Sequence, residues 1–383
     1  MRFVVGKRLV LVLALTLAFA AAAASGATST SRSKATRSGT DGEIAFIKYF
    51  TRACPQPAAP AAECGDSQIF TIKPDGTDLQ QMTQGSPKTG RFSLAPNGLS
   101  LLYTVPVKGR GRCGRPLSAT ACGRRYPGRN AIVEAGVDGT QVSVISPPCI
   151  GHCLGDDNPT YSPDGKQIAF ERAFGPIIHR HASVAAIFTM NADGSHLTQL
   201  TEKKTPTSTE DHDPQWSPNG KKIAFVRLNT TAHPRNESAI EVMNADGSHF
   251  ERLTPFRLDA ADPRWSPSGK QLLFNNHGDG DSESNAGQNA NLFTMNANGS
   301  HLTRLTHYRG THVFHFPSAR VSPSAYAQAW SPDGTQILCF RITTHGRGLG
   351  LSVSDNLTII NTHGRRIRQL PPRDAGSPAA WIK

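Results

Sequence analysis

The sequence contains none of the short motifs that mark several common types of enzyme active site. It has no GxSxG nucleophile elbow, which excludes an α/β-hydrolase site of that type. It also has no P-loop, dinucleotide fingerprint or HExxH, which excludes the nucleotide and zinc-peptidase sites built on them. Acidic residues are outnumbered, with 29 Asp and Glu against 41 Lys and Arg, so the formal net charge is +12.

Long apolar runs are absent except at the N-terminus. Three basic residues among the first eight precede an apolar run from Leu9 to Ala24, which ends in Ser25, Gly26 and Ala27. This order is typical of a secretory signal peptide, which we place at residues 1–27. An uncleaved anchor is the alternative, although the run is shorter than the roughly 20 residues of a spanning helix. Residues 28–41 have no apolar periodicity and are predicted to form a disordered leader.

Six of the seven cysteines form close pairs in the sequence. We expect three disulfides, since each pair would close a short loop and such bonds form in oxidising compartments. A metal site is the other interpretation, but no CxxC spacing supports it. The seventh, Cys339, lies in an apolar strand pattern and is expected to be a buried free thiol. The expected pairs are Cys54 with Cys64, Cys113 with Cys122, and Cys149 with Cys153.

One segment, residues 108–129, is strongly basic. In an exported protein, such a segment suits an anionic component of the cell envelope better than a nucleic acid. A solvated loop that binds nothing is the alternative. The candidate binding residues there are Arg110, Arg112, Arg115, Arg124, Arg125 and Arg129.

A repeated phrase dominates the rest of the chain. Its clearest copy runs from Asp213, as DPQWSPNGKKIAFVRL and then IEVMNADGSHFERLT. Related copies begin at Asn158 and Asp262, an altered copy at Ala327 and an eroded one at Arg91. Self-similarity of this kind indicates a repeat architecture. Short runs rich in Ile, Phe, Thr and Val alternate with SPDG and NADG turns, which predicts blades of four antiparallel strands.

The two ends of the repeat region complete one another. The chain ends in SPAAWIK, a first strand without a partner, and the repeat region starts at TDGEIAFIKYF, a turn and second strand. We therefore predict an all-β, six-bladed propeller in which the C-terminal strand completes blade 1. The propeller domain would span residues 42–383. The blades would comprise 42–84 with 376–383, then 85–148, 149–201, 202–254, 255–306 and 307–372.

These units resemble a known family. WSPDG, KIAF and MNADGS with a following LT are similar to the WD-repeat-like units of TolB-type propellers, which are periplasmic proteins of bacteria. The resemblance covers the propeller and not the additional α/β domain that TolB carries. It implies the fold and an extracytoplasmic location.

Propeller geometry would separate two faces. The SPDG and NADG turns would both lie on one face, here called the turn face. Every variable link would lie on the opposite face, here called the loop face. Varied loops on a rigid scaffold are typical of a binding surface. Acidic residues before the inner strands, including Asp211, Asp213 and Asp262, could attract a cation or a basic partner on that face. Alternatively, Asp213, Asp262 and Asn158 cap the turn into the strand before a proline.

Metal-binding side chains are scattered through the predicted loops. Asp279 and Asp281 alternate like a calcium loop but lack the glycine and closing Glu of an EF-hand. Histidines gather at His307, His312 and His315, and imidazole is a common metal ligand. A divalent cation is thus conceivable without a specific motif, and we expect no other cofactor.

We therefore expect a secreted or periplasmic binding or scaffolding propeller without catalytic activity. It would bind a protein or an anionic cell-envelope partner through its loop face, as a monomer without a transmembrane span. No nucleic-acid binding is expected. The alternative is a metal-dependent polysaccharide lyase or hydrolase at the mouth of the central channel, since oligogalacturonate lyases are similar propellers.

Overall fold

The computed structural model divides the chain into two compact units, residues 1–38 and 39–383. All described residues belong to the second unit, so the predicted signal peptide and leader lie outside them. Among these residues, no helix is long and apolar enough to cross a membrane. The described residues are 42–51, 65–82, 92–107, 129–137, 141–149, 153–175, 184–202, 209–230, 237–276, 289–308, 314–316, 319–321, 324–345, 352–371 and 375–382.

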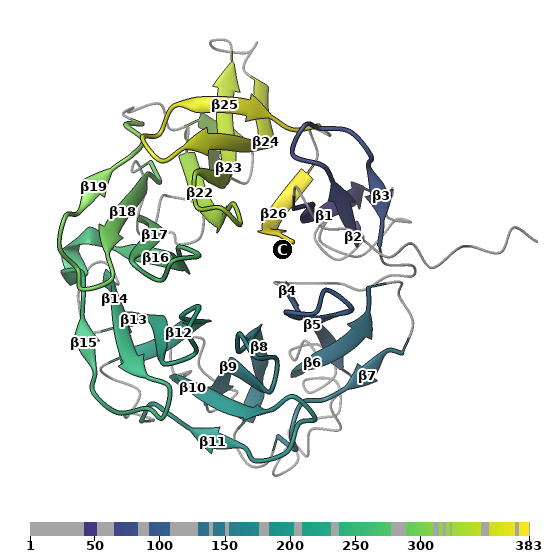
Figure 1. Cartoon of the computed structure of the whole chain (residues 1–383), viewed down its shortest axis with the longest axis vertical. Coiled ribbons are helices and arrows are strands. Elements are labelled where there is room, and N and C mark those ends of the chain that lie inside the picture. The colour runs from purple at the N-terminus through teal and green to yellow at the C-terminus, as the bar shows by residue number, and fades with distance from the viewer. Residues whose placement is uncertain are drawn as a thin grey trace, which may run out of the picture. The chain divides into compact units, whose positions relative to one another are not determined.

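The second unit is a ring of antiparallel blades, each with four strands ordered from the centre outward (Figure 1), and one parallel bridge between Asn130 and Gly155 joins blades 2 and 3 into a single sheet. Blade 1 contains β26 (Ala375–Trp381), β1 (Ile44–Thr51), β2 (Gly65–Ile72) and β3 (Gln80–Gln81). Blade 2 contains β4 (Phe92–Leu94), β5 (Ser100–Val107), β6 (Arg129–Gly136) and β7 (Ser143–Val144). Blade 3 contains β8 (Cys153–Tyr161), β9 (Gln167–Phe174), β10 (Val184–Asn191) and β11 (Thr198–Gln199).

The second half of the ring repeats the same pattern. Blade 4 contains β12 (Thr209–Trp216), β13 (Lys222–Asn229), β14 (Glu237–Asn244) and β15 (Glu251–Arg252). Blade 5 contains β16 (Ala260–Trp265), β17 (Gln271–Asn276), β18 (Leu292–Asn296) and β19 (Thr303–Arg304). Blade 6 contains β22 (Ser324–Trp330), β23 (Gln336–His345), β24 (Ser352–Asn361) and β25 (Arg366–Gln369). A short hairpin of β20 (Phe314–Phe316) and β21 (Ala319–Val321) precedes blade 6.

The predicted closure of the ring is confirmed. Strand β26 pairs with β1, with Trp381 opposite Ile44, so the C-terminal strand is the inner strand of blade 1. The buried side chain of Gln328, on β22, accepts a hydrogen bond from the backbone N–H of Ala379 at 2.8 Å. Arg264, on β16, donates to the carbonyl of Gln328 at 2.9 Å. Blades 5, 6 and 1 are therefore linked through neighbouring inner strands.

The repeated turns form for local reasons. In the first turn of blade 3, the carboxylate of Asp164 accepts hydrogen bonds from the Ser162 hydroxyl and the Lys166 N–H, at 2.6 and 3.1 Å. Gly194, in the second turn, has a φ of +84°, which favours glycine. A Cβ there would lie 2.5 Å from the carbonyl oxygen of Ile145, in the preceding blade. The glycine of the NADG turn therefore allows adjacent blades to pack closely.

In blades 3 to 6 the aromatic residue at the end of the inner strand packs against the preceding blade, as its position in the repeat predicts, whereas blade 2 has Leu94 there. Trp265 donates from Nε1 to the carbonyl of Gln215 at 3.1 Å, and Trp330 donates to that of Arg264 at 3.2 Å. Cys339 replaces the buried phenylalanine of other blades and is a buried free thiol, as expected. Burial raises its pKa to about 12, so the thiol is unreactive.

The interpretation that Asn158, Asp213 and Asp262 cap a turn is wrong. All three lie inside the inner strands β8, β12 and β16, at irregularities in the pairing with the second strand. Their φ values are +51°, +52° and +55°. Asn and Asp tolerate this left-handed conformation better than most residues. These side chains therefore stand at bulges, which bend the strands beside the centre of the ring.

Candidate functional site

Charged side chains gather on blades 3 and 4, mainly in the half of the inner and second strands nearest the loop face, with one member on the third strand of blade 4. We call this group the charge cluster. It lies in a protein that is basic overall, and it contains more carboxylates than cations. Its members are Asp156, Asp157, Glu171, Arg172, Glu210, Asp211, His212, Asp213, Arg227 and Glu241.

A buried ion pair forms the blade 3 part of the cluster. Arg172, on β9, donates from Nε and Nη2 to the two carboxylate oxygens of Asp156, on β8, at 2.6 and 2.9 Å. Both side chains are at least 95% buried. The guanidinium also lies 5.6 Å from the ring centres of Phe170 and Phe188. Two-point pairing fixes the direction as well as the position of the carboxylate.

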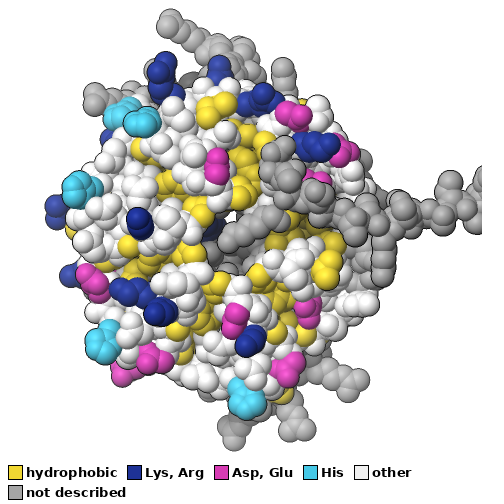
Figure 2. Space-filling model, in the orientation of Figure 1, with side chains coloured by type: hydrophobic (Ala, Val, Ile, Leu, Met, Phe, Trp, Pro, Cys, Tyr) yellow, Lys and Arg dark blue, Asp and Glu magenta, His cyan; other side chains and the backbone are white. Residues whose placement is uncertain are grey.

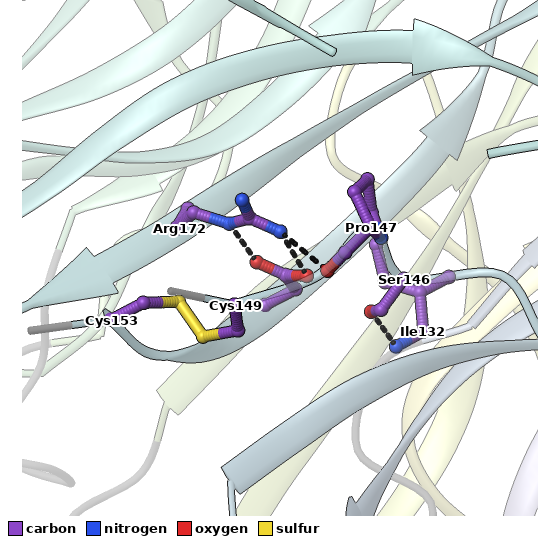
Figure 3. Close-up of a disulfide and its surroundings, with 7 residues drawn as sticks. Ile132, Ser146, Pro147, Cys149, Cys153 and Arg172 are labelled. Atoms are coloured by element: carbon purple, nitrogen blue, oxygen red, sulfur yellow. Dashed lines mark hydrogen bonds and ion pairs between the residues drawn. A yellow bond between two sulfur atoms is a disulfide. The ribbon is translucent and has the colours of Figure 1, made fainter. Parts of the chain in front are cut away.

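The link that enters blade 3 is fixed to this pair. Cys149 and Cys153 form a disulfide across the link from blade 2, and this expected bond is thus confirmed. Arg172 Nη2 also donates to the carbonyl of Pro147 at 3.2 Å, as Figure 3 shows beside the disulfide. The link is therefore held by a covalent bond and by a hydrogen bond from a charged side chain.

A similar pair in blade 4 has a third member. Arg227, on β13, donates from Nε and Nη2 to Asp211, on β12, at 2.7 and 3.0 Å. Its Nη1 donates to Glu241, on β14, at 2.6 Å. Asp211, a candidate binding residue, therefore has both of its oxygens on an arginine within its own blade.

His212 and Glu171 connect the two blades. Glu171 Oε2 accepts hydrogen bonds from Asn158 Nδ2 at 2.8 Å and from the backbone N–H of Asp213 at 3.2 Å. His212 Nδ1 lies 3.4 Å from the same oxygen, and its Nε2 lies 3.3 Å from Glu210 Oε2. The imidazole thus bridges a buried carboxylate of blade 3 and a carboxylate at the loop face of blade 4.

This arrangement shifts both pKa values. Burial lowers the pKa of His212, but the hydrogen bond and charge of Glu171, followed by Glu210 and Asp213, outweigh burial and raise it well above its ordinary value. For Glu171, burial raises the pKa, whereas His212, Asn158 and the Asp213 N–H together lower it. The pair is therefore an imidazolium and a carboxylate at neutral pH.

The charged form of His212 should stabilise the protein in a pH-dependent manner. Because the folded pKa exceeds the unfolded one, this contribution is complete below the unfolded pKa of about 6.5 and is lost as pH rises through the folded value. We expect the free energy of unfolding of the wild type to fall between neutral and alkaline pH more than that of His212→Gln, as measured by urea unfolding. His307→Gln, at an exposed site, is the control. Equal slopes for the wild type and His212→Gln would contradict the expectation.

Asp157 lies at the junction of blades 2 and 3. Burial raises its pKa to about 6, although Asn130 Nδ2 donates a hydrogen bond to it at 2.7 Å and lowers the pKa in part. Its carboxyl group can therefore change charge near neutral pH. The preceding residue, Asp156, is instead paired with an arginine.

Most of the predicted site residues lie outside the described residues, and the others belong to different blades. Arg129 begins β6, and His315 lies in the hairpin strand β20, but nothing is described of their side chains. His307 is exposed after β19. The described residues contain no group of three His, Cys, Asp or Glu side chains arranged to hold a metal ion. Outside the described residues lie Arg110, Arg112, Arg115, Arg124, Arg125, Asp279, Asp281, His312, Cys54, Cys64, Cys113 and Cys122.

Sequence reasoning missed Glu171, Arg172 and Arg227. A signal for the arginines was present, because they occupy the same position in successive repeats, opposite Asp156 and Asp211. Blade 5 has Ala260 and Asn276 at these two positions, so the aspartate and the arginine are both replaced in that blade. No comparable signal marks Glu171, since two of its partners, His212 and the Asp213 N–H, belong to the next blade.

The fold is shared with known propellers. A scan with protein-family models and a search of curated proteins give no match. TolB from Acinetobacter baumannii is similar at a TM-score of 0.53 and 19% identity, over 89% of this chain and 66% of that chain. Putative TolB from Agrobacterium tumefaciens is similar at a TM-score of 0.51 and 14% identity, over 89% of this chain and 99% of that chain. A chain of a nidogen/laminin complex is similar at a TM-score of 0.51 and 10% identity, over 89% of this chain and 99% of that chain. By its fold, this chain is a TolB-like six-bladed β-propeller.

Proposed function

We propose that this propeller is a non-catalytic binding or scaffolding module, secreted or periplasmic, that binds a protein or an anionic cell-envelope component through its loop face. The observation that carries the proposal is the fixed charge cluster. Buried ion pairs at Asp156 and Asp211 fix the inner strands of blades 3 and 4, and the partly exposed side chains of His212 and Glu210, 29% and 19% exposed, are held together close to the loop face. Charges that are ordered before binding lose little conformational entropy when a partner arrives.

Two further features support this proposal. The Cys149–Cys153 disulfide is typical of proteins in oxidising compartments, which agrees with export. One of the similar folds comes from a nidogen/laminin complex, which is an assembly of proteins. The basic segment 108–129 belongs to the same proposal as the part that contacts anionic groups, and the proposed module acts as a monomer without nucleic acid.

Affinity capture from cell-envelope extracts tests the proposal. We compare the wild type with a loop variant in which Arg110, Arg112, Arg115, Arg124, Arg125 and Arg129 are changed to Gln. A control variant removes charges outside both proposed binding surfaces, at the exposed Lys73 and Lys166 in the turns of blades 1 and 3. The wild type and the control are expected to retain a partner that the loop variant loses by about tenfold or more. Equal capture by all three would refute a role for the basic segment.

Calorimetry separates this proposal from the alternative of a metal-dependent lyase or hydrolase. Titration with calcium, manganese or zinc is expected to give no binding heat, because the proposed module needs no cofactor. A stoichiometric binding heat, together with cleavage of an acidic polysaccharide, would instead establish the enzyme.

A further inference from the structure

One position of the repeat carries an exposed apolar side chain in every blade. It follows the second turn of each blade, at or just before the outer strand. The exposed fraction ranges from 40% for Leu197 to 60% for Val142. A single exposed apolar residue needs no explanation, but one at the same place in all six blades does. The six residues are Leu79, Val142, Leu197, Phe250, Leu302 and Ile367.

The backbone before these residues is fixed. In five blades the preceding residue has a positive φ, between +54° and +57°, for example His196 and His301. In blade 3, Asn191 Nδ2 lies 2.8 Å from His196 Nδ1 and donates to the Ser195 hydroxyl at 2.9 Å. The left-handed residue turns the chain, so the next side chain points away from the buried pattern of the strand. In these five blades, exposure is thus a property of the turn and not of a frayed end.

Charge divides the turn face into two parts. On blades 4 to 6 the exposed charged residues of the turns and outer strands are mostly basic: Lys221, Lys222, Arg252, Lys270, Arg304, Arg365, Arg366 and Arg368, against Asp246, Glu251 and Asp333. Figure 2 shows Lys and Arg side chains along the edge formed by β15, β19 and β25. On blades 1 and 3 acids predominate, with Asp75, Asp78, Asp164 and Asp193 against Lys73 and Lys166.

From this distribution, we propose that blades 4 to 6 dock through the turn face onto an anionic lipid surface. Leu302 and Ile367 would enter the interface between headgroups and acyl chains, while the surrounding Lys and Arg contact the headgroups. Apolar insertion combined with cationic contact is the usual basis of peripheral membrane binding. The docked protein would keep its loop face turned away from the membrane.

The spacing of the apolar residues favours lipid over other occupants. Each one belongs to a different blade and is surrounded by polar turn residues, so they form separate points and not a groove for a shaped partner. Equivalent positions in a repeat lie at the same height around the ring, which suits a flat, fluid surface. A second copy would bring two chains of formal charge +12 together.

Co-sedimentation with vesicles tests the proposal. Vesicles of phosphatidylcholine are compared with vesicles that contain about one third phosphatidylglycerol, at low and high salt. The test variant is Leu302→Ser with Ile367→Ser, on the basic half, and the matched control is Leu79→Ser with Leu197→Ser, on the acidic half. Phe250 is left unchanged because its ring packs edge-on against Phe225, with centres 6.2 Å apart. The circular dichroism spectra of both variants are compared with that of the wild type to check that they fold.

The wild type and the control variant are expected to bind the anionic vesicles, and this binding should weaken at high salt. The test variant is expected to bind the same vesicles about tenfold more weakly than the wild type. Equal binding to both kinds of vesicle, or equal loss in both variants, would overturn the proposal. Two other outcomes would also overturn the proposal, because each would assign a different binding partner to the turn face. Binding of soluble polyglutamate but not of anionic vesicles would indicate an acidic protein partner. A dimer in gel filtration that the test variant abolishes would indicate a second copy of the chain.

Discussion

A chain that ends at Pro372 should not unfold in the single cooperative transition expected of the closed ring. It lacks β26, so β1 becomes an exposed edge strand in the middle of a core cluster. That cluster joins Ile44 and Phe46 of blade 1 to Leu338 and Leu357 of blade 6, and Trp381 packs against it. We expect the melting temperature to fall by about 10 °C or more, or no folded state to form, as measured by circular dichroism and limited proteolysis.

A chain that lacks only Lys383 is the control, because the last described backbone hydrogen bond, from Ile382 to the carbonyl of Glu43, is kept. It should unfold like the wild type. An unchanged melting temperature in the shorter chain would show that the ring does not depend on its C-terminal strand, contrary to the pairing of Trp381 with Ile44.

The second large effect is expected from Arg172→Met. The substitution leaves Asp156, which is 99% buried, without its cationic partner, while a side chain of similar length keeps the contacts with Phe170 and Phe188. Breaking a buried pair from one side costs about 3–5 kcal/mol of the free energy of unfolding, measured with urea. The link with Pro147 also loses a hydrogen bond, so β8 and its disulfide should become more open to proteolysis.

The double variant Arg172→Met with Asp156→Leu separates the two causes. If the loss comes from an unpaired charge, the double variant should be more stable than Arg172→Met alone, because no buried charge remains. Arg252→Met, at an exposed position, is the control and should change stability by less than about 0.5 kcal/mol. A double variant less stable than the single one would assign the loss to packing.

Periodic features could be predicted from the sequence because each copy supports the others. The turns around Pro163 and Gly194, the aromatic at Trp265 and the strand patterns recur, and the unmatched strand at Trp381 predicts the closure. These features depend on contacts within a blade or with an equivalent neighbour. The residue types in each turn and strand, and their recurrence in every copy, therefore point to the same structure.

Other features could not be predicted from the sequence, either because they depend on a single neighbour in space or because the pattern does not reveal the backbone conformation. Glu171 meets His212 only because blades 3 and 4 are adjacent, and the equivalent of His212 in blade 5 is Ala261. The bulges at Asn158 and Asp213 need a positive φ, which the sequence permits but does not require. The exposure of Leu197 and Leu302 was missed because strand alternation alone does not show that the preceding histidine turns the chain.

The pairing of β1 with β26 also decides how the molecule can be held. Trp381 Nε1 donates to the carbonyl of Gly42 at 2.8 Å, so the first and last described segments leave the ring side by side, on the turn face. A tether at either end would therefore pull on the same point of the same blade. A surface that holds the protein by such a tether would present the opposite end, with its disulfide-linked loop, to the surrounding solution.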